Sequence, residues 1–246
     1  MRELLLLAMT RAAIETYAGR LEHALPALRE RVERAAALSG RSAADVRLVA
    51  VTKAHPLDAV EAALAAGLAD LGENRIEELE DKVGELGRDV ATWHMIGHLQ
   101  SRKARRALDV ADLIHSVDTP KLGEKLSRAA VETNRMARVL VQVNTSGEAS
   151  KSGFSGATAA ERIVELAELP GIEVGGLMTM APFVDDEAVL SHTFGELRRL
   201  GERLREASNA VGPELSMGMT NDLEVAIREG STMVRIGTAL FGERVR

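Results

Sequence analysis

Residues 48–56 of the chain read LVAVTKAHP, and the fold assignment starts from this stretch. Residues 48–51 are aliphatic, which predicts a short buried strand rather than an exposed helix face. Pro56 suits the first turn of a following helix, because the N–H that proline lacks is not needed there. Lys53 therefore lies in a strand-to-helix turn. Taken alone, a lysine at a strand end is most simply a solvated group, so the rest of the chain has to decide its role.

The same alternation of a short aliphatic run and a charged amphipathic stretch repeats along the chain. A helix is predicted first, over residues 10–38, with apolar side chains near one face and Gly40 just after its end. Eight strands are predicted, over residues 46–52, 69–71, 92–96, 113–117, 138–144, 172–178, 214–217 and 233–236. Helices are predicted between them, over residues 57–66, 76–86, 121–133, 159–169, 186–207 and 222–229.

Eight strands that alternate with helices predict an α/β fold: a single (β/α)8 TIM-type barrel with an additional N-terminal helix. We expect one domain over residues 1–246, with residues 1–16 as an N-terminal extension. A doubly wound open sheet is the alternative, but no Gly-x-Gly-x-x-Gly follows the first strand. In a barrel, the carboxyl ends of all strands meet at one mouth, which carries the chemistry. The predicted strand ends are Lys53, Asn74, His94, His115, Asn144, Met178, Ser216 and Arg235.

The composition narrows the class of protein. Of the 246 residues, 46% are hydrophobic, and 31 basic against 37 acidic residues give a net charge of −6. Without a long basic run, binding of nucleic acid through a general positive field is not expected. The absence of cysteine excludes disulfides and thiolate metal sites. The leucine-rich start is too short for a signal peptide and no segment suits a membrane span, so we expect a soluble cytoplasmic protein.

A lysine in a barrel mouth can condense with an aldehyde or ketone to form a Schiff base. The reaction needs the neutral amine, and partial burial beside residues 48–51 would favour that form of Lys53. The carbonyl partner could be a sugar, as in aldolases, or pyridoxal 5'-phosphate (PLP).

The stretch SMGMTNDLEVAIREGSTMVRIGTALFG, residues 216–242, contains the loops after the seventh and eighth strands, where this fold usually binds phosphate. Gly237 lets backbone N–H groups approach an anion, and Ser216 and Thr238 add hydroxyl donors. Arg235 is either an ion-paired arginine or a donor to the pyridine nitrogen of PLP. In the second role, a permanently charged guanidinium would leave that nitrogen largely unprotonated and the ring a weak electron sink.

Other polar residues near the strand ends have two interpretations each. Asn74 either bonds the cofactor ring or caps the next helix. His94 and His98 have the spacing of helical zinc ligands, but their segment is predicted as strand and loop, so no metal site is expected. The basic stretch at residues 102–106 is interpreted as a solvated helix face. Lys151 is interpreted as a loop lysine that reaches the mouth.

Taken together, these motifs resemble the PLP homeostasis proteins, whose barrel is similar to the N-terminal domain of alanine racemase. The resemblance covers residues 46–242 through LVAVTKAHP, GENRIEEL, WHMIGHLQSRKAR, IHSVDTPKL, VLVQVNTSGEASKSGF, GLMTMAP, ELSMGMTNDLEVAI and GSTMVRIGTALFG. It implies a vitamin B6 cofactor held as a Schiff base on Lys53. It also implies that Ser216, Gly237 and Thr238 hold the phosphate, with Arg235 near the ring nitrogen and Asn74 beside the ring.

The chain departs from that family at two points. Many members carry a second lysine two residues after the first, where this chain has His55, so a transfer role for that lysine does not carry over. The stretch before about Tyr17 is also longer than usual.

The resemblance implies a protein that binds, buffers and delivers PLP to apo-enzymes, with no robust turnover. An amino-acid racemase is the competing hypothesis, but it needs a base on each face of the substrate. Alanine racemase takes its second base, a tyrosine, from a further domain that we do not expect here, and Tyr17 is expected far from the mouth. Without the dimer contacts of that domain, we expect a monomer. A Schiff-base aldolase acting on a phosphorylated sugar is the third hypothesis.

Overall fold

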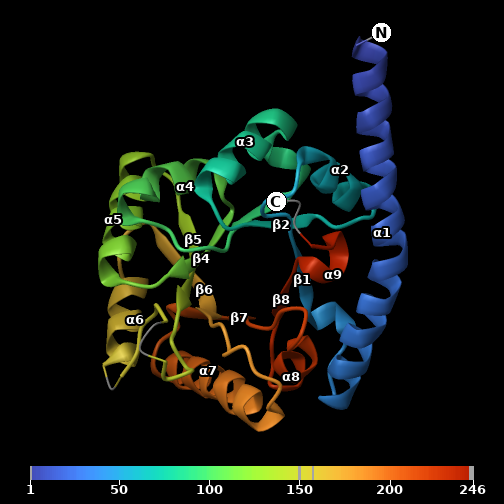
Figure 1. Cartoon of the computed structure of the whole chain (residues 1–246). Helices are drawn as coiled ribbons and strands as arrows, with labels where there is room; N and C mark the ends of the chain where they lie inside the picture. Colours follow the sequence, from blue (N-terminus) through green and yellow to red (C-terminus); the bar gives the residue numbers. More distant parts are fainter. Residues whose placement is uncertain (1, 149–150, 157, 244–246) are drawn as a thin grey trace.

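The structure is a computed structural model that describes residues 2–148, 151–156 and 158–243, with side chains from Tyr17 onward. Within these ranges, eight parallel strands form a closed barrel in the order in which they follow one another along the chain (Figure 1). Their bounds are β1 (Arg47–Val51), β2 (Asp70–Glu73), β3 (Thr92–Met95), β4 (Leu113–Val117), β5 (Ala137–Gln142), β6 (Ile172–Met178), β7 (Val211–Ser216) and β8 (Met233–Ile236). The TIM-type barrel predicted from the sequence is confirmed, and the open sheet is excluded because β1 pairs with β8.

Helices cover the outside of the barrel. Their bounds are α1 (Arg2–Leu38), α2 (Leu57–Ala65), α3 (Ile76–Leu86), α4 (Ala104–Val110), α5 (Pro120–Glu132), α6 (Ala159–Ala167), α7 (Glu187–Ala207), α8 (Leu223–Arg228) and α9 (Thr238–Phe241). Short 3-10 turns lie at η1 (Ala43–Asp45), η2 (Arg88–Val90) and η3 (Ser101–Lys103). The sequence pattern did not predict α4 or α9 as separate helices, because seven and four residues are too few to show a helical period.

The first β/α unit forms as its sequence indicates. Val49, Ala50 and Val51 are buried, and β1 pairs with β2 and β8. Pro56 is the N-cap of α2 rather than its first residue, so the helix begins one position later than the proline. The buried apolar side chains form two clusters. The large one joins the strands to the helices around them, and the smaller one consists of Val49, Leu113, Leu140, Met178 and Met233 from the strands.

Helix α1 packs along one side of the barrel against α2, α8 and α9, and its first turns extend past the barrel (Figure 1). The predicted apolar face is confirmed for Leu21, Leu25, Leu28 and Val32, which are all buried. Ile14 belonged to the same predicted face, but its side chain lies outside the described residues. Across this face, Arg31 forms an ion pair with Glu224 of α8 at 2.6 Å. No helix in the described part of the chain is both long and apolar enough to span a membrane.

Candidate functional site

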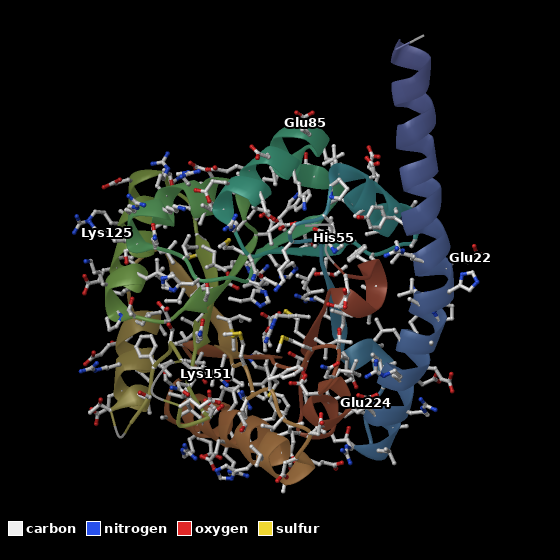
Figure 2. All side chains as sticks on the ribbon, in the orientation of Figure 1. Glu22, His55, Glu85, Lys125, Lys151 and Glu224 are labelled. Atoms are coloured by element: carbon white, nitrogen blue, oxygen red, sulfur yellow. The ribbon has the colours of Figure 1, made fainter. Side chains whose placement is uncertain are left out.

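A cavity of about 590 Å³ opens at the carboxyl ends of the strands. Five of the residues selected from the sequence line it, namely Lys53, Asn74, Arg235, Gly237 and Thr238. They come from the loops after β1 and β2 and from the end of β8, so the closed barrel brings together positions far apart in the sequence. His55 and Lys151, which also line the cavity, approach the barrel opening from different sides (Figure 2).

The turn that carries Lys53 is held by hydrogen bonds on both sides. The Ala54 N–H donates to Glu78 Oε2 at 2.9 Å, and Thr52 Oγ1 donates to Glu73 Oε1 at 2.6 Å. Ala54 has φ +57°, a left-handed conformation that costs a non-glycine residue about 1 kcal/mol. The bond to Glu78 therefore stabilises a turn that the chain would otherwise avoid. The Lys53 side chain is half-buried at the cavity wall.

A second lysine lies behind this turn. Lys82 of α3 donates to the Thr52 carbonyl at 2.8 Å and to Glu73 Oε1 at 2.6 Å, and both side chains are buried. Burial raises the pKa of Glu73, and the charge of Lys82 opposes that rise. Sequence reasoning missed this pair. The available signal was the place of Lys82 three residues after Leu79 on the apolar stripe of α3, where a lysine needs a partner.

Arg235 is a buried cation that faces the cavity. Nη1 donates to the Ser216 carbonyl and hydroxyl at 2.8 and 2.6 Å, and Nη2 donates to the Thr179 carbonyl at 2.9 Å. All three acceptors are neutral, and among the described residues no carboxylate lies within ion-pair distance of the guanidinium. The carboxylate whose charge acts on it from further away is that of Asp222, which also lines the cavity. Burial lowers its pKa to about 10, so it stays charged at neutral pH. A buried cation that has no carboxylate in direct contact, at a cavity wall, is suited to an anionic or electron-rich ligand.

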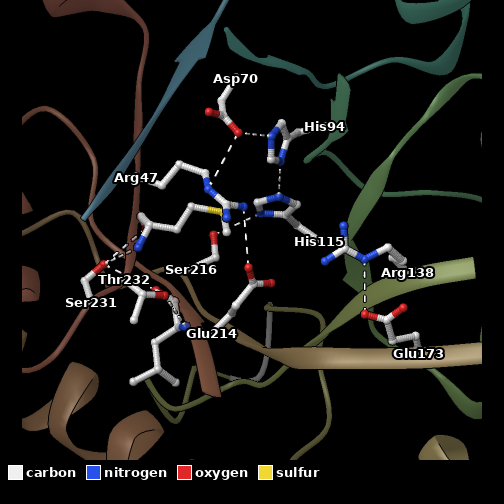
Figure 3. Close-up of polar contacts among 12 residues, drawn as sticks. Arg47, Asp70, His94, His115, Arg138, Glu173, Glu214, Ser216, Ser231 and Thr232 are labelled. Carbon is white, nitrogen blue, oxygen red and sulfur yellow. Dashed lines mark hydrogen bonds and ion pairs between the residues drawn. The ribbon is translucent and has the colours of Figure 1, made fainter. Parts of the chain in front are cut away.

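Four of the residues placed at the mouth by the sequence lie deeper in the barrel: Met178, which belongs to the smaller apolar cluster, and three polar residues. His94, His115 and Ser216 are fully buried and do not line the cavity. Their side chains bond one another instead, with His94 Nδ1 2.9 Å from His115 Nε2 and His115 Nδ1 2.9 Å from Ser216 Oγ (Figure 3). β3 and β4 continue past the two histidines, to Met95 and Val117, so placing the histidines at the strand ends was wrong. Ser216 reaches the cavity only through its bond to Arg235.

The loops after β7 and β8 form one wall of the cavity. A side chain at Gly237 would be crowded, because its Cβ would lie 3.2 Å from the Val51 carbonyl oxygen and one of the two would have to shift. Gly218 has φ +96°, which favours glycine, and its carbonyl accepts the Arg235 N–H at 3.0 Å. The N-cap of α8 is Asp222, which lines the cavity together with Thr220 and Asn221.

Asn74 does not cap helix α3. The N-cap is Arg75, which makes no side-chain cap bond, so of the two interpretations the structure excludes capping and leaves the amide of Asn74 at the cavity wall. His98 also lines the cavity and bonds Asp118 Oδ2 through Nδ1 at 3.0 Å. His94 is inside the barrel and bonded elsewhere, so the two histidines do not share a site. Lys151 reaches the cavity wall and pairs with Glu148 at 2.9 Å.

Tyr17 is closer to the site than the sequence indicated. Its hydroxyl lies 3.1 Å from His55 Nδ1, and its ring meets those of His55 and Phe241 edge-on. His55 lines the cavity two residues after Lys53, so the expectation that Tyr17 lies far from the mouth was wrong. The tyrosine supports the cavity wall from behind through one intervening side chain.

The basic stretch at residues 102–106 lies away from this cavity. Lys103 and Arg106 form ion pairs with Glu77 and Glu80 of α3, so part of the face interpreted as solvated is instead paired. Arg102 and Arg105 line an outer groove of about 790 Å³ that is shared with α5. None of the candidate site residues borders that groove.

The site thus combines a half-buried lysine, a buried and uncompensated guanidinium, and a wall of glycine, hydroxyl and amide groups. Such a set can attach a carbonyl compound covalently and bind an anionic or electron-rich ring beside it.

Comparison with known proteins gives matches over most of the chain. The sequence model of the family described as alanine racemase, N-terminal domain, matches residues 24–245. A pyridoxal phosphate homeostasis protein from Pseudomonas aeruginosa is 43% identical over 218 residues, which are 87% of this chain and 91% of that protein. The protein of the same name from Aquifex aeolicus is 37% identical over 215 residues, 87% of this chain and 94% of its own. The solved structure of PipY from Synechococcus elongatus with PLP bound is 37% identical, with a TM-score of 0.76, and the match covers 86% of this chain and 100% of PipY.

Proposed function

The chain belongs to the alanine racemase N-terminal domain family, among the pyridoxal phosphate homeostasis proteins, and we propose that it binds PLP in the barrel cavity and acts in PLP homeostasis. The cofactor would be attached to Lys53 as a Schiff base. Bound PLP supplies an aldehyde for a lysine amine and an electron-withdrawing ring, and the remaining roles belong to the residues of this chain.

One observation carries this proposal: Lys53 and the uncompensated Arg235 line the same cavity. An amine that reaches a carbonyl and a cation that lacks a counter-ion are the two groups a phosphorylated pyridine aldehyde requires. Gly237 and Thr238 would hold the phosphate through backbone and hydroxyl donors, and Asn74 would bond the ring. Ser216 would act on the ligand through Arg235, because its own hydroxyl is buried against the guanidinium.

We propose buffering and delivery rather than efficient catalysis. Arg235 beside the ring nitrogen would keep that nitrogen unprotonated, which weakens the ring as an electron sink for carbanion chemistry. The name shared by the relatives supports the same role. We infer further that the protein is a cytoplasmic monomer that hands PLP to apo-enzymes. Light scattering after gel filtration measures the molar mass and so tests whether the protein is a monomer. Delivery is tested by mixing the PLP-bound protein with a PLP-dependent apo-enzyme: the apo-enzyme should become active faster than PLP is released into buffer alone.

The first experiment is reduction with borohydride followed by peptide mass spectrometry. Purified protein should be yellow, borohydride should bleach it, and the pyridoxyl mass should be found on Lys53. A Lys53→Ala variant should be colourless. Lys151→Ala is the matched control, because Lys151 is the other lysine at the cavity wall, and it should stay yellow. A pyridoxyl mass found on Lys151 in the wild type would mean that Lys151, and not Lys53, carries the cofactor.

Two other outcomes would replace the proposal. Protein that stays colourless after addition of PLP would support the Schiff-base aldolase. Exchange of the α-hydrogen of alanine for deuterium at ordinary enzyme rates would make the chain a racemase.

A further inference from the structure

A chain of hydrogen bonds crosses the interior of the barrel from its amino-terminal rim to Arg235. Figure 3 shows its part from Asp70 to Ser216. It begins at Asp70, the first residue of β2, whose Oδ1 lies 3.0 Å from His94 Nε2. It continues from His94 Nδ1 to His115 Nε2 at 2.9 Å, and from His115 Nδ1 to Ser216 Oγ at 2.9 Å. It ends where Arg235 Nη1 donates to Ser216 Oγ at 2.6 Å. Four strands contribute to the chain besides β8.

With both histidines neutral, the two ends of this chain fix the direction of every bond within it. A guanidinium only donates and an ionised carboxylate only accepts. Since Ser216 Oγ accepts from Arg235, its own hydrogen is free to donate to His115 Nδ1. His115 must then carry its proton on Nε2 and donate to His94 Nδ1. His94 in turn carries its proton on Nε2 and donates to Asp70.

In this arrangement both histidines are neutral and share one tautomer, with the proton on Nε2. This agrees with their complete burial, and burial lowers the pKa of His115 well below its usual value. Other charges face the same region: Arg47 lies 3.7 Å from Asp70 and 3.4 Å from Glu214 at the amino-terminal rim. Arg47, Asp70 and Glu214 lie at the amino-terminal end of the hydrogen-bond chain. At the other end the charges are those of Arg235 and of Asp222, which lines the same cavity and acts on Arg235 without forming an ion pair with it.

We propose that Asp70, His94, His115 and Ser216 are positioning residues that hold the Arg235 guanidinium for its ligand by connecting it to a distant carboxylate through neutral groups. This inference rests on the proposed function only in naming PLP as that ligand. A carboxylate in direct contact would occupy the donors of the guanidinium. Here three of its five N–H groups are used, on Ser216 and Thr179, and Nε–H and one Nη2–H remain for the cavity.

The first test needs no cofactor. Nitrogen-15 NMR of the ligand-free wild-type protein at pH 7 reports the protonation of each histidine nitrogen. We expect His94 and His115 to be neutral with the proton on Nε2. An Nδ1–H tautomer or an imidazolium at either position would overturn the proposal, whether or not the protein binds PLP.

The second test asks whether His115 acts through Arg235. Replacing His115 by leucine removes both of its bonds, and His115→Gln, which retains one amide donor toward His94, serves if the leucine variant fails to fold. We expect the Kd for PLP to rise about tenfold in His115→Leu, and to change less than twofold when His115→Leu is added to Arg235→Gln. Equal effects in both backgrounds would mean that His115 does not act through Arg235.

The control is Ser127→Ala, which removes another buried hydrogen bond, from Ser127 Oγ to the Pro170 carbonyl at 2.7 Å, outside this chain. It should leave the Kd for PLP unchanged. If it raised the Kd as much as His115→Leu does, the effect would be one of general stability and the proposal would fail. If wild-type protein bound no PLP, the proposed function would fail, and the tautomers alone would decide the positioning role.

Discussion

Two cations, Lys82 and Arg235, are buried within reach of the cavity, and the structure treats them differently. They are similarly covered, with exposed fractions of 7% and 5%. Lys82 contacts the Glu73 carboxylate directly at 2.6 Å, behind the turn that carries Lys53. Arg235 contacts only the neutral oxygens of Ser216 and Thr179.

This difference separates a structural charge from a functional one. A buried charge that meets its counter-ion has little left to offer a ligand, whereas one that meets only dipoles retains most of its attraction for an anion. Lys82 accordingly borders the site without lining it, and Arg235 lines it. The desolvation of both regions is evident, since burial raises the pKa of Glu73 and lowers that of Arg235.

Breaking the ion pair between Lys82 and Glu73 should give the largest loss of stability. In Lys82→Met, Glu73 is left buried without its counter-ion, and we expect the free energy of unfolding in urea at pH 7 to fall by about 3–5 kcal/mol. The loss should shrink toward pH 5, because Glu73 then takes up a proton. Lys125→Met, at an exposed lysine of α5, is the control and should stay within about 0.5 kcal/mol of the wild type. A loss below about 1 kcal/mol in Lys82→Met would mean that the pair is not structural.

Removing the uncompensated cation should change binding rather than stability. In Arg235→Gln we expect the Kd for PLP to rise about 10- to 100-fold, the value of a hydrogen bond to a charged group. The free energy of unfolding should stay equal or increase, because a buried charge without a counter-ion has been removed. Arg228→Gln, at an arginine paired with Glu187 on the surface of α8, is the control and should change neither quantity. Unchanged affinity with lost stability would make Arg235 structural, like Lys82.

The sequence predicts the position of Arg235 at the barrel mouth better than it predicts the ion pair between Lys82 and Glu73. Alternation of strands and helices is a local pattern, so it located the barrel and placed Lys53, Asn74, Arg235, Gly237 and Thr238 correctly at one end of it. The partner of a buried polar group is not local. The apolar stripe of α3 indicates that Lys82 needs a partner, but nothing in the sequence indicates that this partner is Glu73.

Strand ends set a second limit on what the sequence can predict. Successive side chains of a strand point to opposite faces, so a strand end in error by one or two residues misplaces a side chain entirely. His94 and His115 were assigned to the mouth although the predicted strands, residues 92–96 and 113–117, already continued past them as β3 and β4 do, so the error lay in the residue chosen as the strand end and not in the strand bounds. Tyr17 was misplaced for another reason, because a helical pattern does not show which side of a barrel its helix covers.

Replacing both members of the direct pair should largely reverse the loss. In Glu73→Leu/Lys82→Met no charge remains buried, and we expect about 1–2 kcal/mol of destabilisation relative to the wild type, less than in Lys82→Met. The remainder reflects the Thr52 hydroxyl, which loses its acceptor on Glu73. Urea unfolding of both variants at pH 7 measures the difference. A double variant no more stable than Lys82→Met would show that shape, rather than charge, is what Lys82 supplies.

The smallest effect should be a change in how the free energy of unfolding depends on pH. It tests whether His115, between Arg235 and Asp70, is neutral in the folded protein. Because burial lowers the pKa of His115 in the folded protein, the unfolded chain binds the extra proton below about pH 6.5. This group therefore contributes stability above that pH and loses it as the pH falls. Between pH 6.5 and 5.5 the wild type should lose about 1 kcal/mol more than His115→Gln. Glu73 and Asp222, whose pKa values burial raises, change stability in the opposite direction in both proteins, so they cancel in the difference. Equal pH slopes would mean that His115 takes up its proton in the folded barrel, and Ser216 would then lose the acceptor that fixes its hydroxyl toward Arg235.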